Sequence, residues 1–157
     1  MKPEVYMRSA LLSMTARPML LCLATALLAA AAPARAELDI RRGGRLWATI
    51  EDDGTVRIEG RAVGRIEPDG DVRVQGRSAG EVEPSGDIRR SGRVVGRVER
   101  DGTLRHRGRA VGEVADDGTI RQQGRTWGSV RNCCGDFASK RTVAAALAFF
   151  LGEFFGE

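Results

Sequence analysis

GRAVGRIEPDGDVRVQ, residues 60–75, is a 16-residue unit that sets the fold of this chain. The unit recurs without insertion or deletion from Gly76, Gly92 and Gly108. Gly44 begins a more divergent copy and Gly124 a truncated one. Counted from the turn, residues 38–133 make six units of 16 residues. A unit this short cannot bury an apolar face alone, so neighbouring copies must share one core.

Each unit predicts a β-hairpin. Asp69-Gly70 separates two β-rich runs, and Asp-Gly favours a type I′ turn because both residues tolerate positive φ. Val72-Arg73-Val74 then alternates as a half-buried strand does. Val63 and Ile66 stand three apart, so Gly64 marks a β-bulge or else both faces are partly covered.

The hairpins predict an all-β domain closed into a flower-like or barrel-like ring. A half unit lies at each end of the repeat region, so the last strand could pair with the first and leave no sheet edge. Trp47 and Trp127 occupy the same column in the first and last copies, and we expect them to mark the seam or cap the ends. The alternative is a β-solenoid, which would need parallel coils and different corners.

The run Val63-Gly64-Arg65-Ile66-Glu67-Pro68-Asp69-Gly70-Asp71-Val72-Arg73 resembles the bacterial five-fold β-flower proteins, which are tandem hairpin repeats. The similarity covers about residues 38–131, and the small-residue and Phe-rich tail at 144–155 is similar too. The resemblance implies a fold and an uncharacterised function. This chain departs from it in having six units and Gly-Arg linkers.

Residues 1–36 have the order of a secretory signal peptide: a basic start, an apolar run at 19–32, and Ala34-x-Ala36 as a cleavage site. A retained membrane anchor is the alternative, although a 14-residue apolar run is short for a span. We therefore expect export to the periplasm or the extracellular space, with association to the envelope as an option.

Cleavage would change the charge of the protein. The leader holds four of the 25 basic residues and one of the 21 acidic ones, which leaves 21 and 20 and a net charge of +1. The basic character of the whole chain is therefore no nucleic-acid footprint, and we expect no nucleic-acid partner.

Cys133 and Cys134 are neighbours. In an oxidising compartment they could form a disulfide with each other, pair with another chain or stay buried thiols. The pair closes no useful loop, so we expect it to have no structural role across the fold.

Two strict arginine columns run through the repeats, and they are the candidate anion-binding residues. One contains Arg57, Arg73, Arg89, Arg105 and Arg121; the other contains Arg61, Arg77, Arg93 and Arg109. They could bind anionic glycans, lipid head groups or phosphates. The competing and preferred reading is pairing with the repeat's own acids, such as Glu51, Glu67, Glu83 and Glu99.

The sequence shows no catalytic or metal-ligating constellation, and we expect neither a cofactor nor a bound metal. The Asp-Asp-Gly turns match no calcium loop. His106 lacks a nucleophile or a positioned carboxylate and is expected at the rim.

Residues 140–157 are predicted to form a hydrophobic C-terminal helix. We expect it to fold back and cap the open end of the ring. The alternative places it in a membrane interface or against a protein partner, with Lys140-Arg141 facing head groups. The contact residues would then be Phe149, Phe150, Phe154 and Phe155.

The sequence thus predicts an exported β-repeat protein of structural or interaction type, without catalysis. The second hypothesis is an envelope-associated binding module that takes an anionic polymer or membrane surface through its arginine columns.

Overall fold

The computed structural model describes residues 37–152, 154 and 155; the predicted leader, residues 1–36, lies outside this part. These residues form twelve β-strands and one α-helix. The strands are β1 Leu38–Arg42, β2 Arg45–Ile50, β3 Thr55–Ile58, β4 Arg61–Ile66, β5 Asp71–Val74, β6 Arg77–Val82, β7 Asp87–Arg90, β8 Arg93–Val98, β9 Thr103–His106, β10 Arg109–Val114, β11 Thr119–Gln122 and β12 Arg125–Arg131. The helix is α1, Phe137–Phe149.

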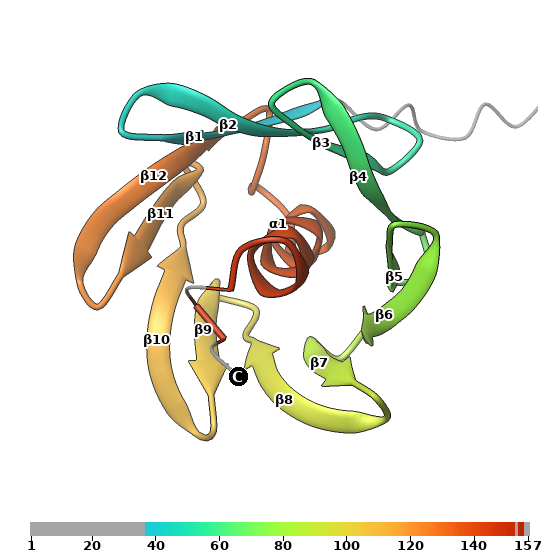
Figure 1. Ribbon diagram of the computed structural model, residues 1–157. Coiled ribbons are helices and arrows are strands. Elements are labelled where there is room, and N and C mark those ends of the chain that lie inside the picture. Colours follow the sequence, from blue (N-terminus) through green and yellow to red (C-terminus); the bar gives the residue numbers. More distant parts are fainter. Residues whose placement is uncertain (1–36, 153, 156–157) are drawn as a thin grey trace, which may run out of the picture. The chain divides into compact units, whose positions relative to one another are not determined.

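The strands close into one antiparallel barrel in chain order (Figure 1). Each strand pairs with its sequence neighbours, and β1 also pairs with β12, where Ile40 lies opposite Val130. The predicted ring is confirmed. The solenoid alternative is wrong, because the ladders of this barrel are antiparallel rather than parallel. Six hairpins complete the circle.

Two kinds of turn alternate around the barrel, and the prediction for the Asp-Gly turn was wrong in type. At Asp53-Gly54 only the glycine has a positive φ, +87°. The Gly54 N–H donates to Glu51 O and the Glu51 N–H donates to Thr55 O, both at 2.9 Å. This is a type I turn followed by a left-handed glycine.

The type I′ conformation occurs at the opposite end, where two residues join successive strands. Glu59 and Gly60, between β3 and β4, have φ of +50° and +76°. We call this end, with its six two-residue turns, the basic end. The end with the Asp-Gly loops is the acidic end. The six two-residue turns are 43–44, 59–60, 75–76, 91–92, 107–108 and 123–124.

A β-bulge recurs in each hairpin, as one of the two sequence readings predicted. Val56 faces Gly64 while Arg57 faces Ala62, so Val63 is the extra residue. The same shift places Trp47 and Trp127 at bulges. Their rings meet edge to face, with centroids 6.0 Å apart, where the ring closes. The prediction that they mark the seam is confirmed.

Helix α1 lies inside the barrel (Figure 1). The prediction that it caps an open end was wrong. The hairpins supply mainly β-branched side chains, which leave a lumen wide enough for a helix of small residues. Val143, Ala144, Ala145, Ala146, Leu147 and Ala148 are all fully buried. The helix completes a core that the strands cannot fill alone.

The bounds of the helix also differ from the predicted range, 140–157. Asp136 is the N-cap, and its side chain accepts a hydrogen bond from the Ser139 N–H at 2.8 Å. This capping starts the helix at Phe137, before its apolar run begins. At the other end, the Phe150 N–H donates to Ala146 O, and Arg90 Nη2 donates to Ala148 O. A cation at the carboxyl end of a helix stabilises it.

Four C-terminal phenylalanine rings pack against four of the five glycines that recur in β4, β6, β8, β10 and β12. At all five glycines the backbone carbonyl of the facing strand also leaves no room for a Cβ. A Cβ added at Gly64 would lie 2.5 Å from the Phe150 ring, and one at Gly80 would lie 2.7 Å from Phe149. The remaining two pairs are Gly96 with Phe155 and Gly112 with Phe154, at 2.6 and 2.8 Å. Each ring therefore packs against bare backbone that only glycine provides.

Candidate anion-binding site

The first arginine column is neutralised by the acids of the repeat, as the preferred sequence reading predicted. Arg57 Nε lies 2.6 Å from Glu51 Oε1, and the same pair recurs in the following units. The further pairs are Arg73–Glu67 at 3.8 Å, Arg89–Glu83 at 2.6 Å, Arg105–Glu99 at 2.7 Å and Arg121–Glu113 at 3.1 Å. Arg121 turns to Glu113 because Ala115 replaces the usual glutamate of its unit.

These arginines also fasten the two-residue turns. Arg57 Nη1 donates to Gly60 O at 3.3 Å, and Arg89 and Arg105 repeat the contact with Gly92 and Gly108. A guanidinium held on both sides in this way has few donors left for a ligand.

The second arginine column is different. Arg61, Arg77, Arg93 and Arg109 each begin a strand directly after a two-residue turn, and all four are exposed. Within the part of the chain that the structure describes, their guanidinium groups have no ion-pair or hydrogen-bond partner. Arg45 and Arg125 hold the same place in the first and last hairpins. The basic end thus carries a ring of arginines, which we call the arginine crown.

Arg93 of the crown also lines a cavity of about 580 Å³ formed by residues of β7, β8 and β9. Arg90, Arg93, Arg97, Arg105, His106 and Arg107 line it. Val95 and Phe155 add apolar surface to the same cavity. Cavities of this size hold small ligands or the side groups of larger ones.

Three of the arginines in this cavity have internal partners. Arg97 binds both carboxylate oxygens of Asp87, at 2.7 and 3.1 Å. Its hydrogen bond lowers the pKa of Asp87 and so keeps that carboxyl ionised. Arg105 pairs with Glu99, and Arg90 binds the helix terminus. Arg93 and Arg107 have no such partner among the described residues, and they supply the free positive charge of the cavity.

His106 takes part in packing rather than standing at a loose rim. Its Nδ1 lies 2.8 Å from Val95 O, the carbonyl of the bulge residue of β8. Its ring meets Phe155 edge to face, with centroids 6.2 Å apart. His106 therefore closes the floor of the cavity.

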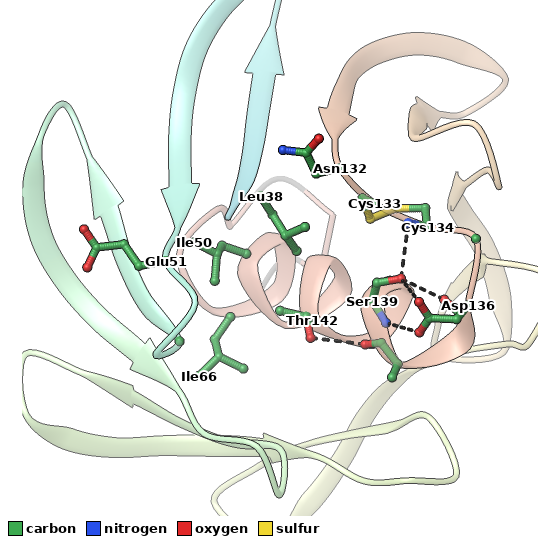
Figure 2. A pocket seen from close by; sticks show the side chains of 13 residues that line it. Leu38, Ile50, Glu51, Ile66, Asn132, Cys133, Cys134, Asp136, Ser139 and Thr142 are labelled. Atoms are coloured by element: carbon green, nitrogen blue, oxygen red, sulfur yellow. Dashed lines mark hydrogen bonds between the residues drawn. A yellow bond between two sulfur atoms is a disulfide. The ribbon is translucent and has the colours of Figure 1, made fainter. Parts of the chain in front are cut away.

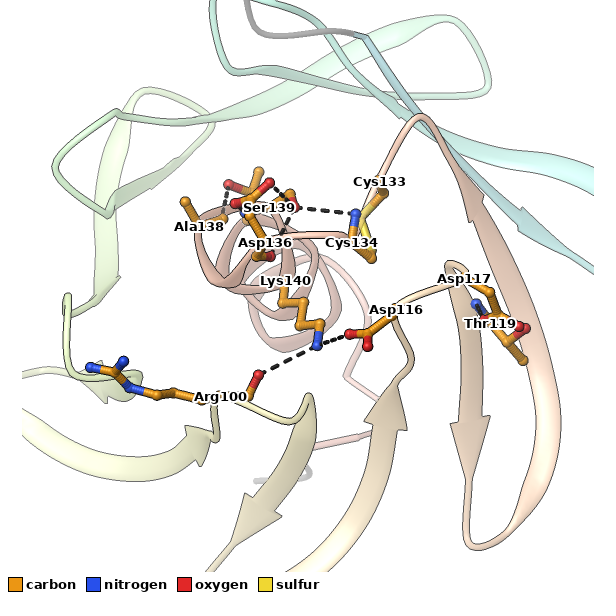
Figure 3. The surroundings of a disulfide bond; sticks show 11 residues. Arg100, Asp116, Asp117, Thr119, Cys133, Cys134, Asp136, Ala138, Ser139 and Lys140 are labelled. Atoms are coloured by element: carbon orange, nitrogen blue, oxygen red, sulfur yellow. Dashed lines mark hydrogen bonds and ion pairs between the residues drawn. A yellow bond between two sulfur atoms is a disulfide. The ribbon is translucent and has the colours of Figure 1, made fainter.

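The candidate contact residues of the tail do not form a surface patch. Phe154 and Phe155 are 3% and 1% exposed, and Phe149 and Phe150 pack against the same core. Lys140 is also buried, where its ammonium pairs with Asp116 and donates to Arg100 O at 3.4 Å (Figure 3). Arg141 Nη2 donates to Val82 O at 2.9 Å. These groups hold the helix inside the barrel.

Sequence reasoning missed Arg90, Arg97 and Arg107 as members of the site. Arg107 could have been found from the sequence, because it is the basic residue in a turn column that otherwise contains no basic residue. The other members of the column are Glu59, Gln75, Ser91 and Gln123. Arg97 alternates with Glu81 and Glu113 in its own column, and only the fold shows that it lines the cavity.

The described residues contain no group of three or more His, Cys, Asp or Glu side chains placed to hold a metal ion. Among the residues that the structure describes, no helix is both long enough and apolar enough to cross a membrane. No family model, curated protein or solved structure matches this chain.

Proposed function

We propose that this chain is an exported interaction protein without catalysis, and that its basic end binds an anionic polymer of the cell envelope. The observation that carries the proposal is the contrast between the two arginine columns. The column that contains Arg57 forms ion pairs with acids of the repeat. The column that contains Arg61 is exposed and has no partner within the described residues. Unpaired guanidinium groups are suited to phosphate and carboxylate, which they bind through two parallel hydrogen bonds.

A repeating ligand fits a repeating receptor. The crown places one arginine on each of six hairpins, so a polymer with an anion in every repeat could engage several at once. Each contact would be weak, because exposed ion pairs are worth only about 0–1 kcal/mol. Several contacts on one chain raise the overall affinity by effective concentration.

The cavity beneath Arg93 and Arg107 would take one anionic group with an apolar portion against Val95 and Phe155. The architecture also supports kinship with the β-flower proteins, with six hairpins rather than five. The predicted leader supports a place outside the cytoplasm, in the periplasm or the extracellular space.

The test is binding of inorganic polyphosphate to the protein that begins at Glu37, measured by titration calorimetry at 20 and 200 mM salt. The Debye length falls about threefold between these two salt concentrations. We expect R61Q/R93Q to weaken binding about tenfold and to flatten its salt dependence. The matched control R57Q/R73Q removes the same charge from the paired column and should change binding about twofold or less.

Neutral dextran should not bind. Equal losses in the two double variants would contradict the proposal, because net charge alone would then account for binding. Circular dichroism of each variant shows that the barrel is intact.

A further inference from the structure

The cavity at the basic end is one of three cavities that occupy equivalent places in the repeat. It has a volume of about 580 Å³ and is formed by residues of β7, β8 and β9 and of the turn that follows. Two smaller cavities, of about 240 and 170 Å³, are lined by the corresponding residues one and three repeat units earlier. Because the backbone plan is shared, differences between the side chains show what is particular to the largest cavity.

The largest cavity is the basic member of this set. Arg107 takes the place of Ser91 in the 240 Å³ cavity and of Glu59 in the 170 Å³ cavity. Arg97 likewise takes the place of Glu81. Positive charge therefore belongs to this copy of the cavity and does not follow from the repeat alone.

His106 adds a donor that depends on a proton. Its Nδ1 lies 2.8 Å from Val95 O, and because a carbonyl only accepts, Nδ1 carries the hydrogen. The Nε2 atom has no hydrogen-bond partner in the described part of the chain, and it is not buried. Nε2 is therefore the atom that His106 offers to a ligand in the cavity.

The charged groups around the His106 ring are mostly basic. They come from β7, β8, β9, β10 and the turn between the last two, and they are Asp87, Arg90, Arg93, Arg97, Arg105, Arg107 and Arg109. Asp87 is held by Arg97. Arg93, Arg107 and Arg109 have no partner among the described residues. The described surroundings of the ring thus contain unpaired positive charge and no unpaired carboxylate.

Apolar surface completes the cavity. Val95 and Phe155 line it, and so does Val94, which is 53% exposed. Ser78 holds the place of Val94 in the 240 Å³ cavity. Exposed apolar surface beside unpaired guanidinium groups suits a ligand that has a hydrocarbon group attached to its anion.

The cavity at the acidic end has no comparable free charge. It has a volume of about 560 Å³ and opens where helix α1 presents small side chains to the first hairpin (Figure 2). Its two carboxylates lie on opposite sides of the aliphatic side chains (Figure 2). Glu51 pairs with Arg57, and Asp136 accepts hydrogen bonds from the N–H and the hydroxyl of Ser139. A charged ligand is therefore expected at the basic end.

We propose that the cavity at the basic end binds a phosphate monoester with a hydrocarbon body, and that His106 takes up a proton as the anion binds. Arg93 and Arg107 donate to phosphate oxygens, and Val94 and Phe155 contact the hydrocarbon. Neutral Nε2 has a lone pair, which repels an oxyanion, whereas a proton from solvent makes it a donor. The inference rests on the proposed function, because it gives the ligand class and the proton dependence of one part of the same basic end.

The sign of the pH dependence follows from this contact. Imidazole groups gain or lose their proton between about pH 5 and 8. A bound anion favours the imidazolium, so the complex keeps its proton to a higher pH than the free protein does. The affinity for the anion must therefore fall as the pH rises through this range.

The experiment uses the protein that begins at Glu37 and phenylmethanesulfonate, a probe whose charge is constant over this pH range. His106 is the one histidine of the sequence, so its ring resonances report on the site directly in two-dimensional NMR. We expect the sulfonate to bind about tenfold more tightly at about pH 5.5 than at about pH 8, and the titration midpoint of His106 to move to higher pH. Phenyl phosphate should bind in the same place. Benzyl alcohol and methanesulfonate, which lack the charge and the ring respectively, should bind several-fold more weakly.

Two variants and one control test the assigned roles. His106→Gln introduces the residue found at Gln122 in the last hairpin, and it should remove the difference in affinity between the two pH values. Arg107→Gln introduces the residue found at Gln75 and should weaken sulfonate binding several-fold at both pH values. The control Arg100→Gln removes an exposed arginine at the acidic end and should have no effect.

The inference is overturned if the wild type binds the sulfonate equally at both pH values, if His106→Gln keeps the difference, if the alcohol binds as tightly as the sulfonate, or if phenyl phosphate does not bind. Polyphosphate tests the proposed function separately. Loss of polyphosphate binding with pH-dependent sulfonate binding intact would contradict the proposed function alone. Polyphosphate binding with His106 resonances that the sulfonate leaves unmoved would overturn this inference alone.

Discussion

At the level of single residues, the glycines opposite the phenylalanine rings determine how closely helix and strand can approach. Gly96 has no positive φ, so its requirement is steric and comes from the Phe155 ring and the Arg105 carbonyl. We expect Gly96→Ala to lower the free energy of unfolding by about 1–3 kcal/mol, because overpacking displaces a well-packed ring. Urea unfolding measures it.

Gly152→Ala is the control for that substitution. Nothing lies within 4 Å of a Cβ at Gly152, and we expect a change of less than about 0.5 kcal/mol. The double variant Gly96→Ala/Phe155→Leu replaces the ring with a smaller side chain, and it should recover part of the free energy of unfolding lost in Gly96→Ala. A strictly additive double variant would show that the ring is not what excludes the methyl group.

The capping aspartate predicts a response to acid. The hydrogen bond from the Ser139 N–H lowers the pKa of Asp136 in the folded protein. The resulting stabilisation is present above the unfolded pKa, about 3.9, and is lost as the pH falls through the lower folded value. Asp136→Ala should cost about 1 kcal/mol at pH 7 and less near pH 2. Thermal melting of the wild type and the variant at both pH values measures the loss of stability. An equal loss at both pH values would show that the charge of Asp136 is not its cause.

At the level of elements, the linker from β12 to α1 contains a disulfide that closes no chain loop. Disulfides that close long loops typically contribute about 2–4 kcal/mol through the unfolded state. We expect reduction with dithiothreitol to lower the free energy of unfolding by less than about 1 kcal/mol in urea unfolding. A loss in the usual range would instead assign the pair a role in holding the linker.

The hairpins were predictable because their signals are local. Asp-Gly and the alternation of Val72-Arg73-Val74 lie within a few residues of the structure they specify. The type of the Asp-Gly turn was missed because Asp53 binds the Thr55 N–H, a local contact that competes with the type I′ conformation. The helix start was missed although Asp136 and Ser139 stand at capping distance in the sequence.

At the level of the whole molecule, the barrel depends on its helix. A chain that ends at Ser139 loses Val143–Ala148 and four phenylalanine rings from the core. We expect it to aggregate or to lack a cooperative thermal transition, whereas the chain from Glu37 to its C-terminus melts cooperatively. Size-exclusion chromatography and near-ultraviolet circular dichroism measure the two states. A folded, monomeric truncated protein would show that the strands enclose a stable core without the helix.

Closure was predictable from the half units and the two tryptophans, but the content of the lumen was not. Which side of α1 is small, and which hairpin it faces, depends on the angle at which the helix enters the barrel. That angle is set by contacts distant in sequence, such as Lys140 with Asp116. For the same reason the two cavities could not be located from the sequence. The arginine columns could be, but which column is paired with the acids of the repeat depends on the register of neighbouring strands.

The position of helix α1 after all six hairpins in the sequence has a consequence for biosynthesis. The ribosome makes all six hairpins before it makes the segment that fills them. Until then each hairpin has exposed β-branched side chains and no interior to bury them in. Final folding must wait for the helix, and it joins segments far apart in the chain, which is slow. A chain that stops before the helix would keep the apolar side chains of its lumen exposed, and such a state is prone to aggregation.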